Sequence, residues 1–227
     1  MTRPLPEIKP VGDTGLLLRF GDRISDDIHD QVLAAERLMD GNKIPGLGER
    51  IPSYAALYVS YDVDVISYAD AREALLALDW QHASASGMPN KSWDIPICFD
   101  PEFAFDLQGV ADLGGVTPGE AQAALLRSQF KVYMFGFAPG YAYLGGTDTT
   151  IQVPRKAAPR RDIPKGSVMI AGPQCLICPL VMPSGWHVIG RTPFDLLDRD
   201  GAQPSPLSVG DRLRFVEVDR IDYEAAL

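Results

Sequence analysis

The fold of the second half of the chain is decided by the stretch FKVYMFGFAPGYAYLGG, residues 130–146. It opens with a β-type run at 131–135 and continues into a loop that holds four glycines. Comparable β-type runs follow at 167–170 and 187–189, with glycine and proline between them at intervals of about eight to twelve residues. This spacing predicts a closed β-barrel or a β-sandwich after Phe130.

The first 90 residues predict a different, mixed architecture in which strands alternate with helices. Residues 15–20 and 55–61 alternate apolar and polar side chains, as strands do. Helices are expected from Ser25 to Gly41 and from Ser67 onwards, because both serines can cap a first turn and apolar residues recur at helical spacing. This order predicts a small ferredoxin-like α+β domain.

A turn-rich linker separates the two regions. Its residues, 82–91 (HASASGMPNK), are small and polar. The second region is expected to open with a strand and two helices, at 93–99, 105–113 and 117–129. The last of these helices begins with a capping box, Thr117-Pro118-Gly119-Glu120. We therefore expect a ferredoxin-like domain at 1–90 and a β-barrel domain at 91–227.

The 227 residues have the composition of a folded protein, with 46% hydrophobic and 22% charged residues. The formal charge of −9 disfavours binding to nucleic acids or anionic membranes, because such a field repels phosphate. The N-terminus lacks the apolar core of a secretory signal, and the longest apolar run, 175–183, is about half as long as a membrane span. Three cysteines give no even disulfide framework, so we expect a cytoplasmic protein.

The loop at 136–146 is the first candidate site. Glycine lets a ligand approach the main chain closely, and interleaved aromatic residues can form the wall of a pocket. The alternative is a tight crossover, in which the glycines serve turns and the aromatic residues fill the core; the residues alone favour neither interpretation. The candidate pocket residues are Gly136, Phe137, Pro139, Gly140, Tyr141 and Tyr143.

Residues 154–166, PRKAAPRRDIPKG, form a cationic segment with five basic residues and one acid in an otherwise acidic chain. Its three prolines stiffen the backbone, so the cations are held in place at a low entropic cost. Arginine forks match the oxygens of carboxylates and phosphates. We expect an anion site at Arg155, Lys156 and Arg160, for a substrate carboxylate or a nucleotide phosphate; the alternative is a solvated surface loop.

Four further candidates lie outside these stretches: Arg191 for the anion site, and Gln174, Trp186 and His187 for the pocket. Imidazole titrates near neutrality, which suits His187 to acid or base work. However, no carboxylate stands at a diagnostic spacing, and this favours a packing role. Arg191 either reaches a cleft or bridges a loop. We nominate no acid–base pair.

Several strong motifs are absent, including GxxxxGK[ST], GxGxxG after a strand and HExxH. The CxxC at Cys175–Cys178 supplies at most half of a structural zinc site and lacks a thioredoxin-like context. Two small core residues explain it better. We therefore predict no metal ion and no prosthetic group in this chain.

Taken in order, these motifs resemble one family: the B-type subunits of 5-oxoprolinase, also known as allophanate hydrolase subunit 1 or as carboxyltransferase-domain subdomains C and D. The family includes a sporulation-kinase inhibitor. The resemblance covers nearly the whole chain. It rests on GFAPG at 136–140 with YLGG at 143–146, on PRK at 154–156 with PR at 159–160, and on IGRTP at 189–193.

The resemblance implies a ferredoxin-like domain followed by a cyclophilin-like β-barrel. It implies a C-type and an A-type partner subunit, and an enzyme that uses ATP as a co-substrate to open the lactam of 5-oxoproline to glutamate. The expected function is therefore that of an amide and lactam hydrolase subunit, inactive alone. The alternatives are a binding module that inhibits a sensor histidine kinase, and a subunit of an allophanate or urea-amide hydrolase.

The sequence departs from the family pattern AG-[GS]-Q-T-G-I-Y-P at residues 171–179, which read AGPQCLICP. Leu176 stands where the family has glycine, and Cys175 and Cys178 stand where it has a hydroxyl and a phenol. Ser184 also replaces a glycine. These differences at 173–178 and at Ser184 fall in an expected pocket strand and leave open a paralogue with another substrate.

Overall fold

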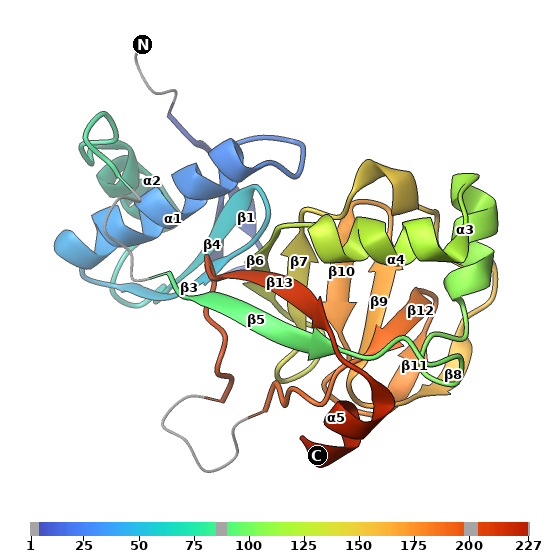
Figure 1. Ribbon diagram of the computed structural model, residues 1–227. Helices are drawn as coiled ribbons and strands as arrows, with labels where there is room; N and C mark the ends of the chain where they lie inside the picture. The colour runs from blue at the N-terminus through green and yellow to red at the C-terminus, as the bar shows by residue number, and fades with distance from the viewer. Residues whose placement is uncertain (1–4, 85–89, 198–203, 227) are drawn as a thin grey trace. The chain divides into compact units, whose positions relative to one another are not determined.

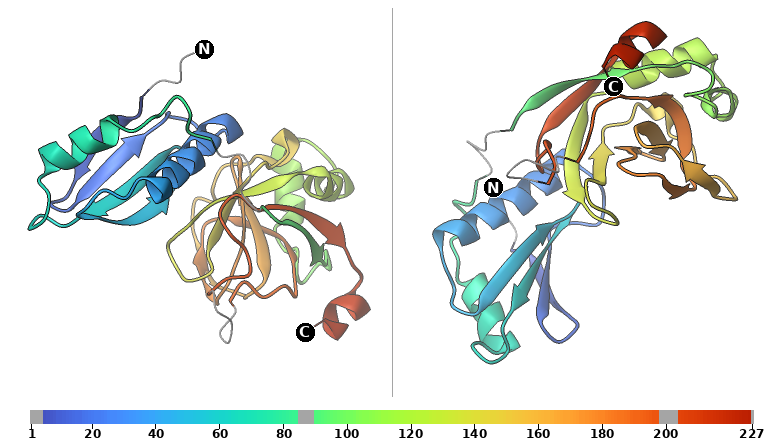
Figure 2. Two further views of the ribbon diagram at one scale, coloured as in Figure 1. Left: turned by 90° about the vertical axis from the view of Figure 1, so that its left-hand side faces the viewer. Right: turned by 90° about the horizontal axis from the view of Figure 1, so that it is seen from below.

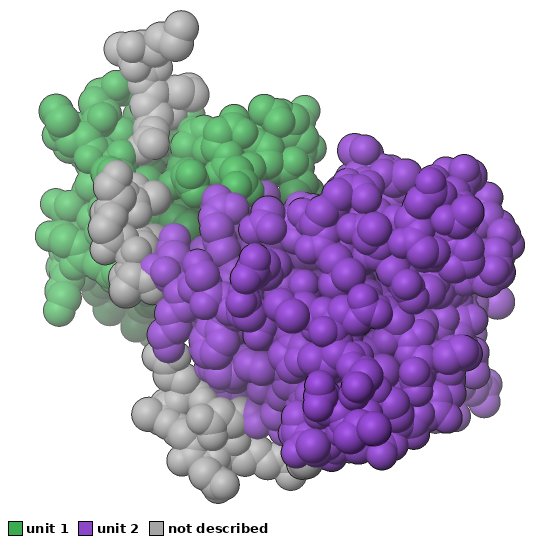
Figure 3. Space-filling view, in the orientation of Figure 1, with its two compact units in different colours: residues 1–89 green, residues 90–227 purple. Residues whose placement is uncertain are grey.

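The computed structural model describes residues 5–84, 90–197 and 204–226. The chain divides into two compact units, residues 1–89 and 90–227 (Figure 3). Each unit buries an apolar cluster of its own. The predicted linker at 82–91 lies partly outside the described residues.

The N-terminal unit is a four-stranded antiparallel sheet with two helices on one face (Figures 1 and 2). Its elements are β1 (Glu7–Val11), β2 (Gly15–Arg19), α1 (Asp26–Gly41), β3 (Leu47–Pro52), β4 (Ala56–Tyr61) and α2 (Tyr68–Leu76). The strand order is β1-β2-β4-β3. Leu16 of β2 lies opposite Val59 of β4, and the same buried cluster receives Val32 from α1 and Leu75 from α2.

The structure confirms both predicted helices of this unit, but only one serine caps as expected. Ser67 Oγ accepts a hydrogen bond from the Asp70 amide at 3.2 Å, at the start of α2. Ser25 is the N-cap residue of α1, yet its hydroxyl contacts the Asp27 carboxylate and accepts nothing from the first turn. The carboxylates of Asp26 and Asp27 still lie at the positive end of the helix dipole.

Two strands of this sheet, β1 and β3, are not predicted by the sequence. Strand β1 buries only Ile8 and contains Pro10, and β3 begins inside a stretch that reads as a proline- and glycine-rich loop. Both are edge strands whose side chains mostly meet solvent, so the apolar alternation that marks a strand is weak. Their pairing with β2 and β4 orders them instead.

The C-terminal unit is a nearly closed, barrel-like sheet of seven strands with a separate two-stranded sheet (Figure 1). Its strands are β5 (Ser92–Ile97), β6 (Phe130–Phe135), β7 (Ala142–Gly145), β8 (Arg160–Ile163), β9 (Ser167–Ala171), β10 (Gln174–Ile177), β11 (Met182–Ser184), β12 (His187–Arg191) and β13 (Arg212–Glu217). Its helices are α3 (Leu107–Gly114), α4 (Pro118–Arg127), the short 3-10 helix η1 (Thr149–Ile151) and α5 (Arg220–Ala225).

The seven strands are ordered β12-β9-β10-β7-β6-β13-β5, and the two edge strands approach each other at one bridge. Cys98, just after β5, donates its amide to the Arg191 carbonyl at 2.8 Å, and the Arg191 amide returns a bond of 3.0 Å to the Cys98 carbonyl. The spacing of glycine and proline in the sequence thus predicts the right class of structure, a sheet that curls toward closure.

Helices α3 and α4 cover one face of this sheet. That face carries Leu144, Cys175 and Ile170 from three neighbouring strands, in the same buried cluster as Val110 of α3 and Leu125 of α4. In the described parts of the chain, no helix combines the length and the apolar character that crossing a membrane would require.

The structure confirms the predicted helices at 105–113 and 117–129, with ends shifted by one or two residues. The capping box of α4 is present: the Glu120 amide donates to Thr117 Oγ1 at 3.2 Å, and the Thr117 amide donates to Glu120 Oε2 at 2.8 Å. The predicted strands correspond to β5, β6, β9 and β12. Six elements of this unit were not predicted from the sequence. They are β7 inside the glycine loop, β8 inside the cationic segment, β10, β11, β13 and α5.

A buried carboxylate joins the start of β5 to the segment before β13. Asp211 is 1% exposed and accepts hydrogen bonds from the Lys91 amide at 2.8 Å, from Trp93 Nε1 at 2.9 Å and from the Ser208 amide at 3.0 Å. These donors offset the cost of burying the charge. Without the carboxylate, three donors would lose their acceptor.

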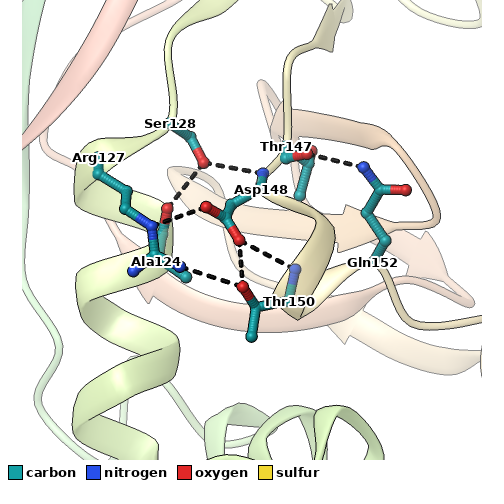
Figure 4. A network of polar contacts seen from close by, with 7 residues as sticks. All are labelled: Ala124, Arg127, Ser128, Thr147, Asp148, Thr150 and Gln152. Carbon is teal, nitrogen blue, oxygen red and sulfur yellow. Dashed lines mark hydrogen bonds and ion pairs between the residues drawn. The ribbon is translucent and has the colours of Figure 1, made fainter.

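A polar network joins the end of α4 to η1 (Figure 4). Arg127 Nε donates to Asp148 Oδ2 at 2.7 Å, and the Thr150 amide donates to Asp148 Oδ1 at 2.9 Å. Ser128 Oγ accepts from the Asp148 amide at 3.0 Å and donates to the Ala124 carbonyl at 2.8 Å. The hydrogen bond from Arg127, followed by those from Thr150, lowers the pKa of Asp148 from 3.8 to about 2.

Replacing Asp211 by asparagine is expected to destabilise the C-terminal unit by about 2–4 kcal/mol, because one accepting oxygen becomes a donor that faces other donors. Urea unfolding followed by tryptophan fluorescence measures this loss, because two of the three tryptophans, Trp93 and Trp186, belong to this unit. The matched control is Asp94→Asn, which breaks an exposed ion pair with Arg214 and should barely move the midpoint. Equal losses in the two variants would show that the buried contacts of Asp211 stabilise nothing.

Asp148→Asn is expected to destabilise the C-terminal unit at pH 7 by roughly 1–2 kcal/mol, after allowance for solvent screening. The folded-state pKa of Asp148 is depressed, so its stabilising effect is fully present above about pH 4 and disappears as the pH falls toward about 2. Hydrogen exchange of the α4 amides in wild type and variant, measured between pH 7 and pH 2, should therefore converge at the acid end. A gap that stays constant with pH contradicts this account.

Candidate anion-binding site

The face of the seven-stranded sheet opposite α3 and α4 is lined by aromatic and apolar side chains. Leu176 of β10 lies between Tyr143 of β7 and Met169 of β9, and Met169 lies opposite Val188 of β12. We call this surface the aromatic face. Its buried members are Tyr141, Ile163, Met169, Ala171, Leu176, Cys178, Trp186 and Val188, against which Phe105, Ala138, Tyr143 and Met182 pack.

Four aromatic rings on this side of the sheet follow one another at contact distance. The ring centres of Phe137 and Tyr141 are 5.2 Å apart, those of Tyr141 and Tyr143 are 5.0 Å apart, and those of Tyr143 and Trp186 are 6.2 Å apart. Tyr141 and Trp186 are buried, whereas Phe137 is exposed. Of the aromatic residues in the glycine loop, Tyr141 therefore belongs to the core and Phe137 faces solvent.

Two arginines of the cationic segment stand on aromatic rings of this cluster. The guanidinium carbon of Arg155 lies 5.6 Å from the ring centre of Trp186, and that of Arg160 lies 3.9 Å from the ring centre of Phe105. Both arginines are exposed, and among the described residues neither forms an ion pair. A contact with a ring attracts a guanidinium without offsetting its charge, so the charge stays available for an anion.

The third predicted cation, Lys156, is already paired. Its Nζ contacts Asp106 Oδ2, and the two side chains are 17% and 18% exposed. The same carboxylate oxygen accepts a hydrogen bond from the Val188 amide at 2.8 Å. Asp106 thus offsets the charge of Lys156, so of the three cations predicted for the anion site Arg155 and Arg160 are the two that are exposed.

The beginning of the cationic segment is hydrogen-bonded to the residues around Trp186. The Lys156 amide donates to the Gly185 carbonyl at 2.8 Å, and His187 Nε2 lies 2.9 Å from the Pro154 carbonyl oxygen. Further along the segment, Arg160 lies opposite Ser184 in the pairing of β8 with β11. The segment is therefore partly a strand, and it is more ordered than the stiff loop that its prolines predict.

The glycine loop also lines a hollow of its own. Phe137 has a φ of +73°, a conformation that is rare outside glycine, and it is 77% exposed. Gly140 has a φ of +72°, and a Cβ there would stand 3.0 Å from the Leu196 carbonyl oxygen, so only glycine fits without a shift. The loop lines an apolar hollow of about 480 Å³, walled by Phe135, Gly136, Ala138, Pro139, Gly140, Pro204, Ser205 and Leu207.

The cations and this hollow do not coincide. Neither Arg155 nor Arg160 is among the walls of the hollow; the rings under them belong to the aromatic face. The hollow and the aromatic face share Ala138, which walls the hollow and packs against the buried members of that face. An anion held by these arginines would therefore lie over the aromatic face.

Two other predicted site residues have different surroundings. The guanidinium carbon of Arg191 lies 5.4 Å from the ring centre of Phe103, and its Nε donates to the Lys165 carbonyl at 3.0 Å, at the bridge that closes the sheet. It touches neither ring on which the other arginines stand. Gln174 is half-buried at the start of β10, opposite Gly145 and Ala171.

The stretch that departs from the family pattern is mostly a buried strand. Burial raises the pKa of the Cys175 thiol, and it raises that of Cys178 to about 11, so both stay protonated at neutral pH. Leu176 is fully buried, and it is not one of the residues with positive φ. Ser184 Oγ accepts a hydrogen bond from the Trp186 amide at 3.1 Å. Among the described residues, no group of three or more His, Cys, Asp or Glu side chains is arranged to hold a metal ion.

Sequence reasoning missed Phe105 and Asp106, which complete the surroundings of the cations. They stand just before α3, in a segment predicted to be helical. Asp106 is separated from Lys156 by 50 residues. A contact between residues so far apart cannot be predicted from local sequence spacing. The one available signal is that an aspartate beside a predicted helix start often takes part in polar contacts.

Comparison with known proteins supports a single relationship. The carboxyltransferase domain, subdomains C and D, matches residues 6–207. The chain is 34% identical over 235 residues to the 5-oxoprolinase B subunit of Bacillus subtilis (strain 168), with 96% of this chain and 95% of that protein covered. A conserved uncharacterized protein from Pyrococcus horikoshii is 34% identical, with a TM-score of 0.57 and coverage of 96% of this chain and all of its own.

A more distant likeness extends to the urea amidolyase of Kluyveromyces lactis, at 16% identity and a TM-score of 0.79. It covers 97% of this chain and 15% of that protein, and it shows the fold alone. The family match and the near-full-length relative agree with the GFAPG, PRK and IGRTP motifs. The chain therefore belongs to the family of carboxyltransferase-domain proteins that contains the B subunits of 5-oxoprolinase.

Proposed function

We propose that this chain is the B subunit of an ATP-dependent 5-oxoprolinase and that it binds a small anion over the aromatic face. The observation that carries the proposal is the position of the Arg155 guanidinium over Trp186 and of the Arg160 guanidinium over Phe105, without an ion pair among the described residues. A stacked guanidinium presents a planar fork of donors that matches the oxygens of a carboxylate or a phosphate.

The chemistry of the reaction suits such a surface. 5-Oxoproline carries a carboxylate beside its lactam amide, and ATP, the co-substrate of the complete complex, carries phosphates. Cations held in place before the ligand arrives stabilise developing negative charge without reorganising. We assign binding and charge compensation to Arg155 and Arg160, and we assign no proton transfer to this chain.

The names of the relatives support a multi-subunit enzyme. The Bacillus subtilis relative is named as a subunit, and the Kluyveromyces lactis protein carries a domain of this fold within a far longer chain. We propose that this chain completes its active site with a C-type and an A-type subunit, in the cytoplasm.

The two units fit the domains that the resemblance implies. In the N-terminal unit, β2, α1, β3, β4 and α2 follow one another as the first five elements of a ferredoxin-like domain do, and β1 occupies the edge beside β2. We propose a ferredoxin-like domain at 1–90 whose remaining strand stands first in the chain. We propose a cyclophilin-like β-barrel at 91–227.

Reconstitution tests the enzyme directly. The purified chain is mixed with C- and A-type subunits, 5-oxoproline and ATP, and glutamate release is followed. We expect glutamate and phosphate to form in equal amounts from the complete mixture, and no glutamate when any one subunit or ATP is left out. A complete mixture that forms no ATP-dependent glutamate contradicts the proposal.

Arg160→Ala is expected to lower kcat/KM for 5-oxoproline in the complete complex by about 10- to 100-fold, because a charge-assisted contact is lost. Arg161→Ala is the matched control: it removes the same side chain from the next position of β8, which strand alternation places on the other side. This control should stay within about 2-fold of wild type. Equal effects of the two substitutions would mean that only the general charge of the segment matters.

A further inference from the structure

Residues 154–156 run alongside residues 185–187, and the two ends of this short pairing are hydrogen-bonded. At one end the Lys156 amide donates to the Gly185 carbonyl at 2.8 Å. At the other end His187 Nε2 meets the Pro154 carbonyl oxygen at 2.9 Å. Between these contacts, Arg155 stands over Trp186. The imidazole and the Gly185 carbonyl thus hold the backbone on both sides of Arg155.

The contact fixes the hydrogen on the imidazole. A carbonyl oxygen only accepts, so Nε2 carries the hydrogen and donates it. His187 is 8% exposed, and its Nε2 is hydrogen-bonded to a backbone carbonyl. With its Nε2–H engaged by the backbone carbonyl, the ring is suited to hold this segment in place.

We propose that His187 is a positioning residue that sets the place of Arg155. Its Nε2–H fixes the Pro154 carbonyl, and this keeps the Arg155 guanidinium on the Trp186 ring with its N–H edges turned to a ligand. The proposal rests on the anion-binding role assigned to Arg155 above. His187 itself touches no ligand and transfers no proton.

Arg160 is held by different contacts, which provides an internal control. Its strand, β8, pairs with β11, where Arg160 lies opposite Ser184, and its guanidinium stacks on Phe105. Neither contact involves the imidazole. Loss of the His187 hydrogen bond should therefore disturb the contribution of Arg155 and leave that of Arg160 intact.

The structural half of the proposal is tested by hydrogen exchange on the full chain. His187→Leu keeps an apolar side chain without a donor, and we expect the Lys156 amide to exchange at least 10-fold faster, with the amides of β9 and β10 unchanged. His187→Gln keeps a donor near the position of Nε2 and should restore most of the protection. Unchanged exchange at Lys156 in His187→Leu overturns the proposal, whatever reaction the protein catalyses.

The functional half uses the complete complex. His187→Leu should raise KM for 5-oxoproline about 5- to 20-fold with kcat within about 3-fold, as expected when binding of ground state and transition state weakens equally. In an Arg155→Ala background the same substitution should change KM by less than about 2-fold, because its route of action is gone. In an Arg160→Ala background the full effect should remain.

The outcomes separate this inference from the proposed function. An effect of His187→Leu on KM or kcat that persists in the Arg155→Ala background would break its link to Arg155 and overturn the proposal, and a fall in kcat that persists there would indicate proton transfer by His187 itself. A wild-type complex that does not act on 5-oxoproline defeats the proposed function alone. In that case the exchange of the Lys156 amide still decides whether His187 holds the segment.

Discussion

Side chains alternate across the seven-stranded sheet, and the candidate site depends on this constraint. Leu144, Cys175 and Ile170 share the helix-covered core, while the neighbouring positions form the aromatic face. A one-residue slip of any strand would move its side chains to the opposite face of the sheet, and both faces are buried. The aromatic face is therefore fixed by the same strand pairing that fixes the helix-covered core.

Within this frame, the character of each cation is set by its neighbour. The chain has a formal charge of −9, yet it keeps Arg155 and Arg160 exposed on aromatic rings. A ring attracts a guanidinium through its face and leaves the positive charge in place, whereas a carboxylate offsets it. Lys156 is the contrasting case, because Asp106 offsets its charge. Of the three cations predicted for the anion site, two thus keep their charge available for a ligand, and Lys156 anchors the segment.

The sequence predicts those features whose signals are local. Helix α4 was predictable because Thr117 and Glu120 cap it within four residues, and β6, β9 and β12 were predictable because each contains a short run of β-branched, aromatic or other apolar residues. Strands β1 and β3 escape prediction because edge strands expose most side chains. Strand β7 escapes because its glycines read as a loop.

The candidate site shows the same difference between features with a local sequence signal and features without one. Arg155 and Arg160 were predictable from a local excess of charge and proline, which is a property of the segment itself. The rings beneath them were not predictable, because Trp186 and Phe105 are far from the cations in the sequence and meet them only in the folded chain. Leu176 and Ser184, where the chain departs from the family pattern, both belong to that platform: Leu176 packs between Tyr143 and Met169, and Ser184 accepts the amide of Trp186. These departures therefore change the surface on which the arginines rest and leave the arginines themselves in place. Under the proposed function, a difference in ligand choice between this chain and its relatives would arise from the shape of the aromatic face, while the anion contact proposed for Arg155 and Arg160 would be shared.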